Sequence, residues 1–90
     1  MVLYTGERDA VSEAVRQAAK DAEAAGKTYG IIDFKGDAER AARGFFKELR
    51  RLDSEGVDLI IAAGISEEGL GEAVMDRMTK AAGDNVRRVI

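Results

Sequence analysis

The residues that could do chemistry in this 90-residue chain are few, because it contains no histidine and no cysteine. The lack of histidine removes the commonest general base near neutral pH and the commonest transition-metal ligand. The lack of cysteine removes disulfides, thiolate nucleophiles and thiolate zinc sites. A Ser-His-Asp relay within the chain is impossible, and only oxygen ligands could hold a metal. The sequence therefore predicts no catalytic residues and no metal site.

Small and polar residues follow the predicted strands, and these are the candidates for binding a ligand. In open parallel sheets, ligands bind beyond the carboxyl ends of the strands. A Gly-Leu-Gly turn also opens the last predicted helix, where free backbone amides could hold an anion. The candidate ligand-binding residues from these positions are Thr5, Gly6, Asp33, Gly64, Gly69 and Gly71.

Each candidate also has a structural interpretation, which we prefer for the Gly-Leu-Gly turn. Three nearby glutamates would repel a phosphate there, and close packing of helix on sheet explains the glycines. Asp33 stands where a dinucleotide-binding domain keeps its ribose-binding acid, yet the first turn holds Gly6 alone instead of three spaced glycines. A carboxylate that caps a turn is the commoner role for Asp33, and Lys35 beside it is expected to be solvated. The sequence contains no Walker-type lysine motif, and the third strand offers no phosphoacceptor aspartate.

The elements that would position these residues follow from apolar spacing. Strands are predicted over residues 2–5, 29–34, 57–63 and 86–90. Between them, helical periodicity begins near Glu7, at an N-cap Asp37 and near Gly69, and the three helices end at Gly26, Gly56 and Gly83. One strand and one crossover helix alternate evenly, so the right-handed crossover rule predicts a parallel sheet. The expected fold is a small doubly wound α/β domain, Rossmann-like or flavodoxin-like, with three layers, four mostly parallel strands and three crossover helices.

The helix faces expected to point inward are set by the same spacing. The inward-facing residues expected in the second helix are Ala38, Ala41, Ala42, Phe45, Phe46, Leu49 and Leu52. For the third helix they are Leu70, Ala73, Val74, Met78 and Ala81. The nearly continuous apolar run at residues 57–63 is typical of a strand covered on both faces, so it should lie centrally.

The order of the strands decides which part of the sheet is left uncovered and is therefore available to a partner. In the common order 2-1-3-4, the first helix covers one face of the sheet and the other two helices cover the opposite face. Part of the first face would then stay bare beside the third and fourth strands. Because large apolar patches rarely stay exposed, we expect another domain or a second copy of the chain to cover it.

Composition limits the class of protein further. The net charge is −3, and the 14 basic and 17 acidic residues are mixed along the chain, so no direct nucleic-acid binding is expected. The longest apolar run, residues 59–65, is far too short for a bilayer, and no signal peptide is visible. The expectation is a single soluble, cytoplasmic domain over residues 1–90 that does not contact a membrane.

Two stretches of the chain resemble the C-terminal domain of bacterial and archaeal threonylcarbamoyl-AMP synthases. The first is AARGFFKELRRLD at residues 41–53, followed by GVDLI at residues 56–60. The second is EGLGEAVMDRM at residues 68–78, followed by KAA at residues 80–82. The chain departs from the family pattern at Asp76, where an asparagine is expected, and at Ser66, where a proline is common.

The resemblance implies a Rossmann-like accessory domain. Family members use threonine, bicarbonate and ATP to make threonylcarbamoyl-AMP, which supplies threonylcarbamoyladenosine in transfer RNA. That chemistry resides in a large N-terminal domain, which these 90 residues lack together with its linker. The resemblance thus implies a non-catalytic docking domain, either cut from a longer enzyme or a stand-alone homologue, with no cofactor of its own and ATP only through the parent enzyme.

Two functions remain open on these residues. The first is a docking domain whose uncovered sheet face binds the missing N-terminal catalytic domain or a second copy of the chain. The second is a small nucleotide- or anion-binding regulatory module that uses the carboxyl ends of the strands.

Overall fold

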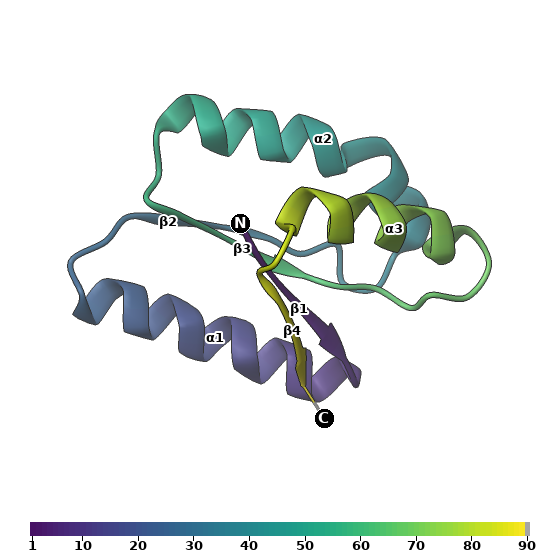
Figure 1. Ribbon diagram of the computed structural model, residues 1–90, viewed down its shortest axis with the longest axis horizontal. Helices are drawn as coiled ribbons and strands as arrows, with labels where there is room; N and C mark the ends of the chain where they lie inside the picture. The colour runs from purple at the N-terminus through teal and green to yellow at the C-terminus, as the bar shows by residue number, and fades with distance from the viewer. Residues whose placement is uncertain (90) are drawn as a thin grey trace.

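Strands and helices alternate along residues 1–89, the part of the chain that the computed structural model describes (Figure 1). The elements are β1 (Val2–Gly6), α1 (Arg8–Ala24), β2 (Tyr29–Ile32), α2 (Ala38–Glu55), β3 (Leu59–Ala63), α3 (Leu70–Ala82) and β4 (Val86–Val89). This confirms the predicted sequence of elements, although β2 and β3 are shorter than expected. The last residue of the predicted fourth strand, Ile90, lies outside the described residues.

The helix ends follow local chemistry. The Asp37 carboxylate accepts a hydrogen bond from the Arg40 backbone N–H at 3.0 Å, as expected of an N-cap. Gly56 ends α2 with φ 70°, in the left-handed region that favours glycine. At α1 the cap is Glu7, whose two carboxylate oxygens accept from the backbone N–H groups of Asp9 and Ala10.

The four described strands pair in parallel, which confirms the central prediction of the fold, but their order is β2-β3-β1-β4. The expected order 2-1-3-4 is wrong. Both orders place the first and third strands inside the sheet and the second and fourth at its edges. Because each inner strand has a neighbour on both sides in either order, the hydrophobic pattern of the sequence does not distinguish the two orders.

The true order moves α1 to the middle of its face, because the crossover from β1 to β2 must pass over β3. Val11 and Val15 of α1 cluster with Ile61 and Ala63 of β3, and all four side chains are buried. The expectation of a bare region is therefore wrong at the third strand, and at the fourth strand Val89 is partly buried against the same cluster. What remains exposed on this face lies at the edge, where Ile31 of β2 is 43% exposed.

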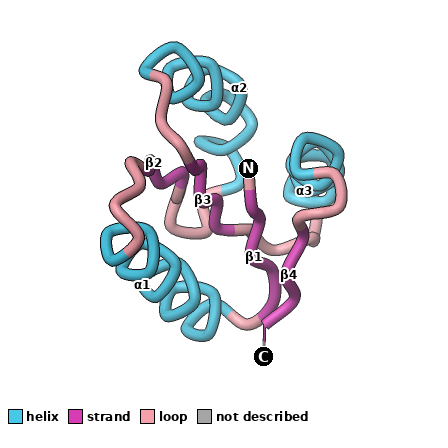
Figure 2. Tube along the Cα trace, turned by 60° about the vertical axis from the view of Figure 1, so that its left-hand side comes forward, coloured by secondary structure: helices cyan, strands magenta, loops and turns pink. Residues whose placement is uncertain are grey.

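The opposite face carries α2 and α3, which pack against each other and over the sheet (Figures 1 and 2). The larger core lies here, and its largest buried side chains are Leu3, Ile32, Phe45, Val74 and Met78. Phe46 was predicted to face inward with Phe45 but is 46% exposed. Phe46 follows Phe45 directly and therefore lies about 100° further around the helix.

The inward face of α3 differs from the prediction by a rotation of about one residue. Leu70, Ala73 and Ala81 are exposed, whereas Val74 and Met78 are buried as expected. The buried residues of α3 are Gly71, Val74, Met75, Met78 and Ala82. The cause is Gly71, which lies so close to the preceding loop that a Cβ there would come within 1.8 Å of the Ser66 carbonyl oxygen. This approach fixes which side of α3 faces the sheet.

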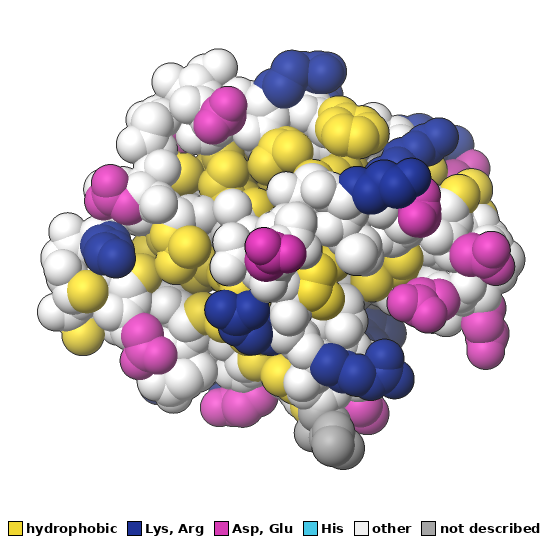
Figure 3. Space-filling model, in the orientation of Figure 1, with side chains coloured by type: hydrophobic (Ala, Val, Ile, Leu, Met, Phe, Trp, Pro, Cys, Tyr) yellow, Lys and Arg dark blue, Asp and Glu magenta, His cyan; other side chains and the backbone are white. Residues whose placement is uncertain are grey.

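None of the helices in residues 1–89 is both long and apolar enough to cross a membrane. On the face shown in Figure 3, acidic and basic side chains are interspersed, with apolar side chains visible between them. This pattern agrees with the mixed charge of the sequence.

Candidate functional site

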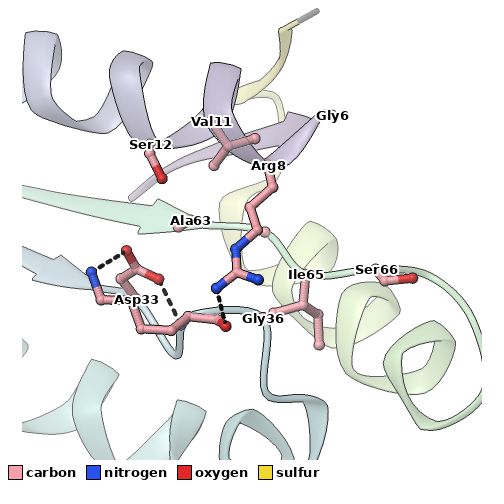
Figure 4. Close-up of a pocket in the computed structure, with 11 residues that line it drawn as sticks. Gly6, Arg8, Val11, Ser12, Asp33, Gly36, Ala63, Ile65 and Ser66 are labelled. Atoms are coloured by element: carbon pink, nitrogen blue, oxygen red, sulfur yellow. Dashed lines mark hydrogen bonds and ion pairs between the residues drawn. The ribbon is translucent and has the colours of Figure 1, made fainter.

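One cavity lies beyond the carboxyl ends of the strands, where open α/β sheets bind ligands. β1 and β3 are neighbours, but the chain leaves β1 toward α1 on one face and leaves β3 toward α3 on the other (Figure 1). This divergence opens a crevice between the two strand ends. A cavity of about 390 Å³ lies there, between the start of α1, the loop after β2 and the loop after β3 (Figure 4).

The structure divides the predicted ligand-binding residues among three places. Gly6, Asp33 and Gly64 line the cavity of 390 Å³. Thr5 lines a neighbouring hollow of about 400 Å³ that also contains Glu67 and Glu68. Gly69 lines a third hollow on α3, and Gly71 lines none of these three. The six candidates therefore do not form one site.

The glycines of the turn before α3 fit their structural interpretation. Gly71 allows the backbone of α3 to approach the Ser66 carbonyl, as described above. The hollow beside Gly69 is lined by Glu67, Glu72 and Asp76, a combination that disfavours anions. The candidate site is therefore the cavity of about 390 Å³ at the ends of the strands.

Asp33 has the turn-capping role that was the commoner expectation. One carboxylate oxygen, Oδ1, accepts from the backbone N–H of Lys35 at 2.8 Å, and the other, Oδ2, lies 3.4 Å from the Lys35 ammonium. Lys35 has φ 55°, an uncommon left-handed conformation that this bond supports. The Lys35 side chain is 76% exposed, so it is solvated as expected, although the residue also lines the cavity.

Arg8 is the charged cavity residue that the sequence did not reveal as a candidate. Its guanidinium Nη2 donates to the Lys35 carbonyl oxygen at 2.8 Å, and thereby joins the start of α1 to the loop after β2 (Figure 4). The two residues are far apart in sequence, so no local pattern reveals the contact. A basic residue in the first turn of a helix that follows a strand was the only available signal. Ser12 and Ser66 also line the cavity and were not among the candidates.

The N-terminus of α1 beside this cavity is already occupied. The backbone N–H groups of Asp9 and Ala10 donate to the Glu7 carboxylate, and these bonds lower the pKa of Glu7 below its usual value. Free amides of α1 therefore contribute little to the cavity, and its affinity for anions depends on side chains.

The lining groups favour binding over catalysis. Two cations, Arg8 and Lys35, outnumber the single carboxylate of Asp33. Ser12 and Ser66 have no histidine to activate them. Within residues 1–89, no group of three or more acidic side chains is placed to hold a metal ion. The cavity can thus hold a small anion and offer hydroxyl groups, but it lacks a nucleophile paired with a base.

Comparison with known proteins gives the same family throughout. Residues 1–83 match the family model described as threonylcarbamoyl-AMP synthase, C-terminal domain. The threonylcarbamoyl-AMP synthase of Pyrococcus abyssi is 36% identical over 100 aligned residues, which cover 99% of this chain and 29% of that protein. The threonylcarbamoyl-AMP synthase of Bacillus subtilis is 44% identical over 50 residues, which cover 56% of this chain and 14% of that protein.

Solved structures of the same family superpose on this chain. The crystal structure of Pyrococcus abyssi Sua5 complexed with L-threonine superposes with a TM-score of 0.90 at 34% identity, over 99% of this chain and 29% of that one. The C-terminal Sua5 domain from Pyrococcus horikoshii superposes with a TM-score of 0.77 at 33% identity, over 97% of this chain and 93% of that one. The chain thus spans less than a third of the full-length relatives that it matches. It belongs to the family of threonylcarbamoyl-AMP synthase C-terminal domains.

Proposed function

We propose that this chain acts as the accessory domain of a threonylcarbamoyl-AMP synthase and docks to the catalytic part of that enzyme without contributing catalytic groups. The observation that carries the proposal is its match to the C-terminal 29% of a full-length relative, with a TM-score of 0.90. The parent reaction would join threonine, bicarbonate and ATP into threonylcarbamoyl-AMP for the modification of transfer RNA.

The side chains of the domain support a non-catalytic role. The chain has no histidine or cysteine, and none of its described side chains is both buried and polar. Perturbed, partly buried titratable groups are typical of catalytic sites. Among residues 1–89, the groups whose pKa departs from the usual value are Glu7, Tyr29 and Arg51. In each of them, hydrogen bonds at the surface are the main cause of the shift in pKa.

The docking surface we propose is the β2 edge of the sheet face that α1 covers. A single helix lies over this face, and the side chain of Ile31 remains 43% exposed beside it. The occupant we favour is the catalytic N-terminal domain, because the full-length relatives carry more than two thirds of their length outside the matched region. A second copy of the chain is the alternative outcome of the test.

The experiment compares this chain alone with a chimaera. In the chimaera, this chain replaces the C-terminal domain of the Pyrococcus abyssi relative. Pyrophosphate release from ATP in the presence of threonine and bicarbonate is measured for both. We expect turnover from the chimaera and none from the chain alone. Turnover by the chain alone, or a folded chimaera no more active than the relative truncated before its C-terminal domain, would contradict the proposal.

A further inference from the structure

We propose that the cavity between the ends of β1, β2 and β3 binds a small phosphate monoester with hydroxyl groups, such as a sugar phosphate or nucleoside monophosphate, through Arg8 and Asp33. This site would be additional to the docking role. In this site the Arg8 guanidinium binds the phosphate, and the Asp33 carboxylate accepts a hydrogen bond from a hydroxyl group of the ligand.

The position of the cavity supports a ligand site. It lies where neighbouring strands send their crossovers to opposite faces, which is where open α/β sheets bind ligands. Its volume of about 390 Å³ falls within the usual range for small-molecule pockets, about 300–1,000 Å³. Three segments far apart in sequence contribute to its lining: the start of α1, the loop after β2 and the loop after β3. Figure 4 shows Arg8 and Asp33 approaching the cavity from different elements.

Arg8 is held ready for an anion. Its Nη2 is fixed by the Lys35 carbonyl at 2.8 Å, and its guanidinium lies against the turn, where a Cβ on Gly36 would be 3.6 Å from Cζ. One carbonyl uses one of the five guanidinium N–H donors, so a pair remains for the parallel bonds that phosphate oxygens accept. A side chain already ordered loses less conformational entropy on binding.

Charge selects a small phosphate over a polyphosphate. Arg8 and Lys35 exceed Asp33 by one positive charge within the cavity. The adjoining hollow contains Glu7, Glu67 and Glu68, which would repel a ligand that extended in that direction. A single phosphate near Arg8 avoids this acidic region.

The Asp33 carboxylate can accept a hydrogen bond from a hydroxyl group of the ligand. Its Oδ1 is engaged by the Lys35 backbone, but Oδ2 has only the Lys35 ammonium at 3.4 Å and can accept a further hydrogen bond. Because Glu7 already occupies the amides of α1, the backbone cannot replace Arg8 as the phosphate ligand.

Isothermal titration of the 90-residue chain tests the site with four probes: ribose 5-phosphate, AMP, adenosine and inorganic phosphate. We expect ribose 5-phosphate and AMP to bind about tenfold or more tightly than inorganic phosphate, and adenosine to give no heat. Arg8→Gln should weaken both organic phosphates about tenfold or more. Arg16→Gln is the matched control, because Arg16 lies on the same helix, pairs with Glu13 and does not line the cavity.

Asp33→Asn separates the two contacts, since asparagine can still cap the Lys35 amide. It should weaken ribose 5-phosphate relative to inorganic phosphate, whose own binding should stay the same or tighten slightly because a negative charge leaves the cavity. Amide chemical-shift changes at Gly6, Gly36 and Gly64 should report the position of the ligand in every variant that retains the fold. No binding of either organic phosphate at millimolar concentration, unchanged affinity in Arg8→Gln, or shift changes confined to another surface would overturn the proposal. These measurements use no turnover, so failure here leaves the docking role untouched.

Discussion

Gly71 illustrates how one missing side chain sets the position of a helix. A Cβ on Gly71 would collide with the carbonyl oxygen of Ser66, which belongs to the backbone and cannot rotate away as a side chain could. We expect Gly71→Ala to reduce the free energy of unfolding by about 2–4 kcal/mol, because α3 or the preceding loop must shift. Urea denaturation measures the loss. Glu72→Ala is the control, and this exposed neighbour should change stability by less than about 0.5 kcal/mol. Equal effects of both changes would contradict the packing role of Gly71.

Glu7 provides a prediction about pH. Hydrogen bonds from two backbone amides hold its pKa below the ordinary value of 4.5 in the folded chain. The carboxylate therefore stabilises the fold fully above pH 4.5, and that contribution is lost as pH falls through the lowered pKa. Glu7→Gln should flatten this part of the stability profile, measured as the urea midpoint at several acidic pH values.

The control for Glu7 is Glu13→Gln on the same helix. Glu13 pairs with the Arg16 side chain and caps no backbone amide. Its variant should keep the acid-dependent loss of the parent chain. A Glu7→Gln profile that matches the parent at every pH would rule out the capping contribution.

At the scale of residues, local features were predictable and distant contacts were not. The cap Asp37 and the left-handed Gly56 follow from neighbouring sequence, and both are confirmed. The contact of Arg8 with the Lys35 carbonyl joins two loops that the sheet brings together. No local spacing encodes this contact, so Arg8 was missed while Gly6, Asp33 and Gly64 were found.

At the scale of elements, α2 offers a matched pair of adjacent aromatics. Phe45 is 2% exposed in the core, whereas Phe46 is 46% exposed. Phe45→Ala should cost about 3–5 kcal/mol of unfolding free energy through lost burial and a cavity. Phe46→Ala should cost about 1 kcal/mol, because much of its surface already contacts water. Thermal and urea unfolding of both variants check this difference, and equal losses would contradict the orientation of α2.

Hydrophobic spacing identified each helix but did not fix its rotation everywhere. The apolar positions of α3 are dense enough to fit two adjacent faces. The choice between them depends on Gly71 against Ser66, a contact outside the helix. In α1 the apolar residues occupy a single stripe, and its buried residues Val11, Val15, Ala19 and Ala22 lie on that stripe.

At the scale of the whole molecule, the proposed docking face can be separated from its alternatives by two lysine substitutions. Ile31 and Phe46 are similarly exposed, at 43% and 46%, but lie on opposite sides of the sheet. Ile31→Lys should change the melting temperature of the isolated chain by only a few degrees. In the chimaera it should lower the melting temperature and the activity further, because a buried charge at the contact is costly.

Phe46→Lys serves as the control and should affect the chimaera no more than the isolated chain. A stronger effect of Phe46→Lys would move the docking surface to the α2 side. Self-association of the chain alone that Ile31→Lys abolishes would instead identify a second copy as the occupant. Analytical ultracentrifugation distinguishes these outcomes.

The overall architecture was predictable because alternating strand and helix patterns leave few arrangements for a chain of this length. The order of the inner strands was not, since β1 and β3 lie between two neighbouring strands in either order and hydrophobic spacing does not tell which neighbour each one has. The resemblance to the family rests on residues 41–60 and 68–82. The region before residue 36, which includes Arg8, gave little signal.

The pairing of β1 with β4 has a consequence for how the chain folds during synthesis. Residues 2–6 leave the ribosome before residues 86–89, which complete one of their hydrogen-bonding edges. Until then β1 presents an open strand edge, which readily pairs with other chains. A nascent or truncated chain that ends before Val86 should therefore aggregate far more readily than the finished sheet, however well its helices form.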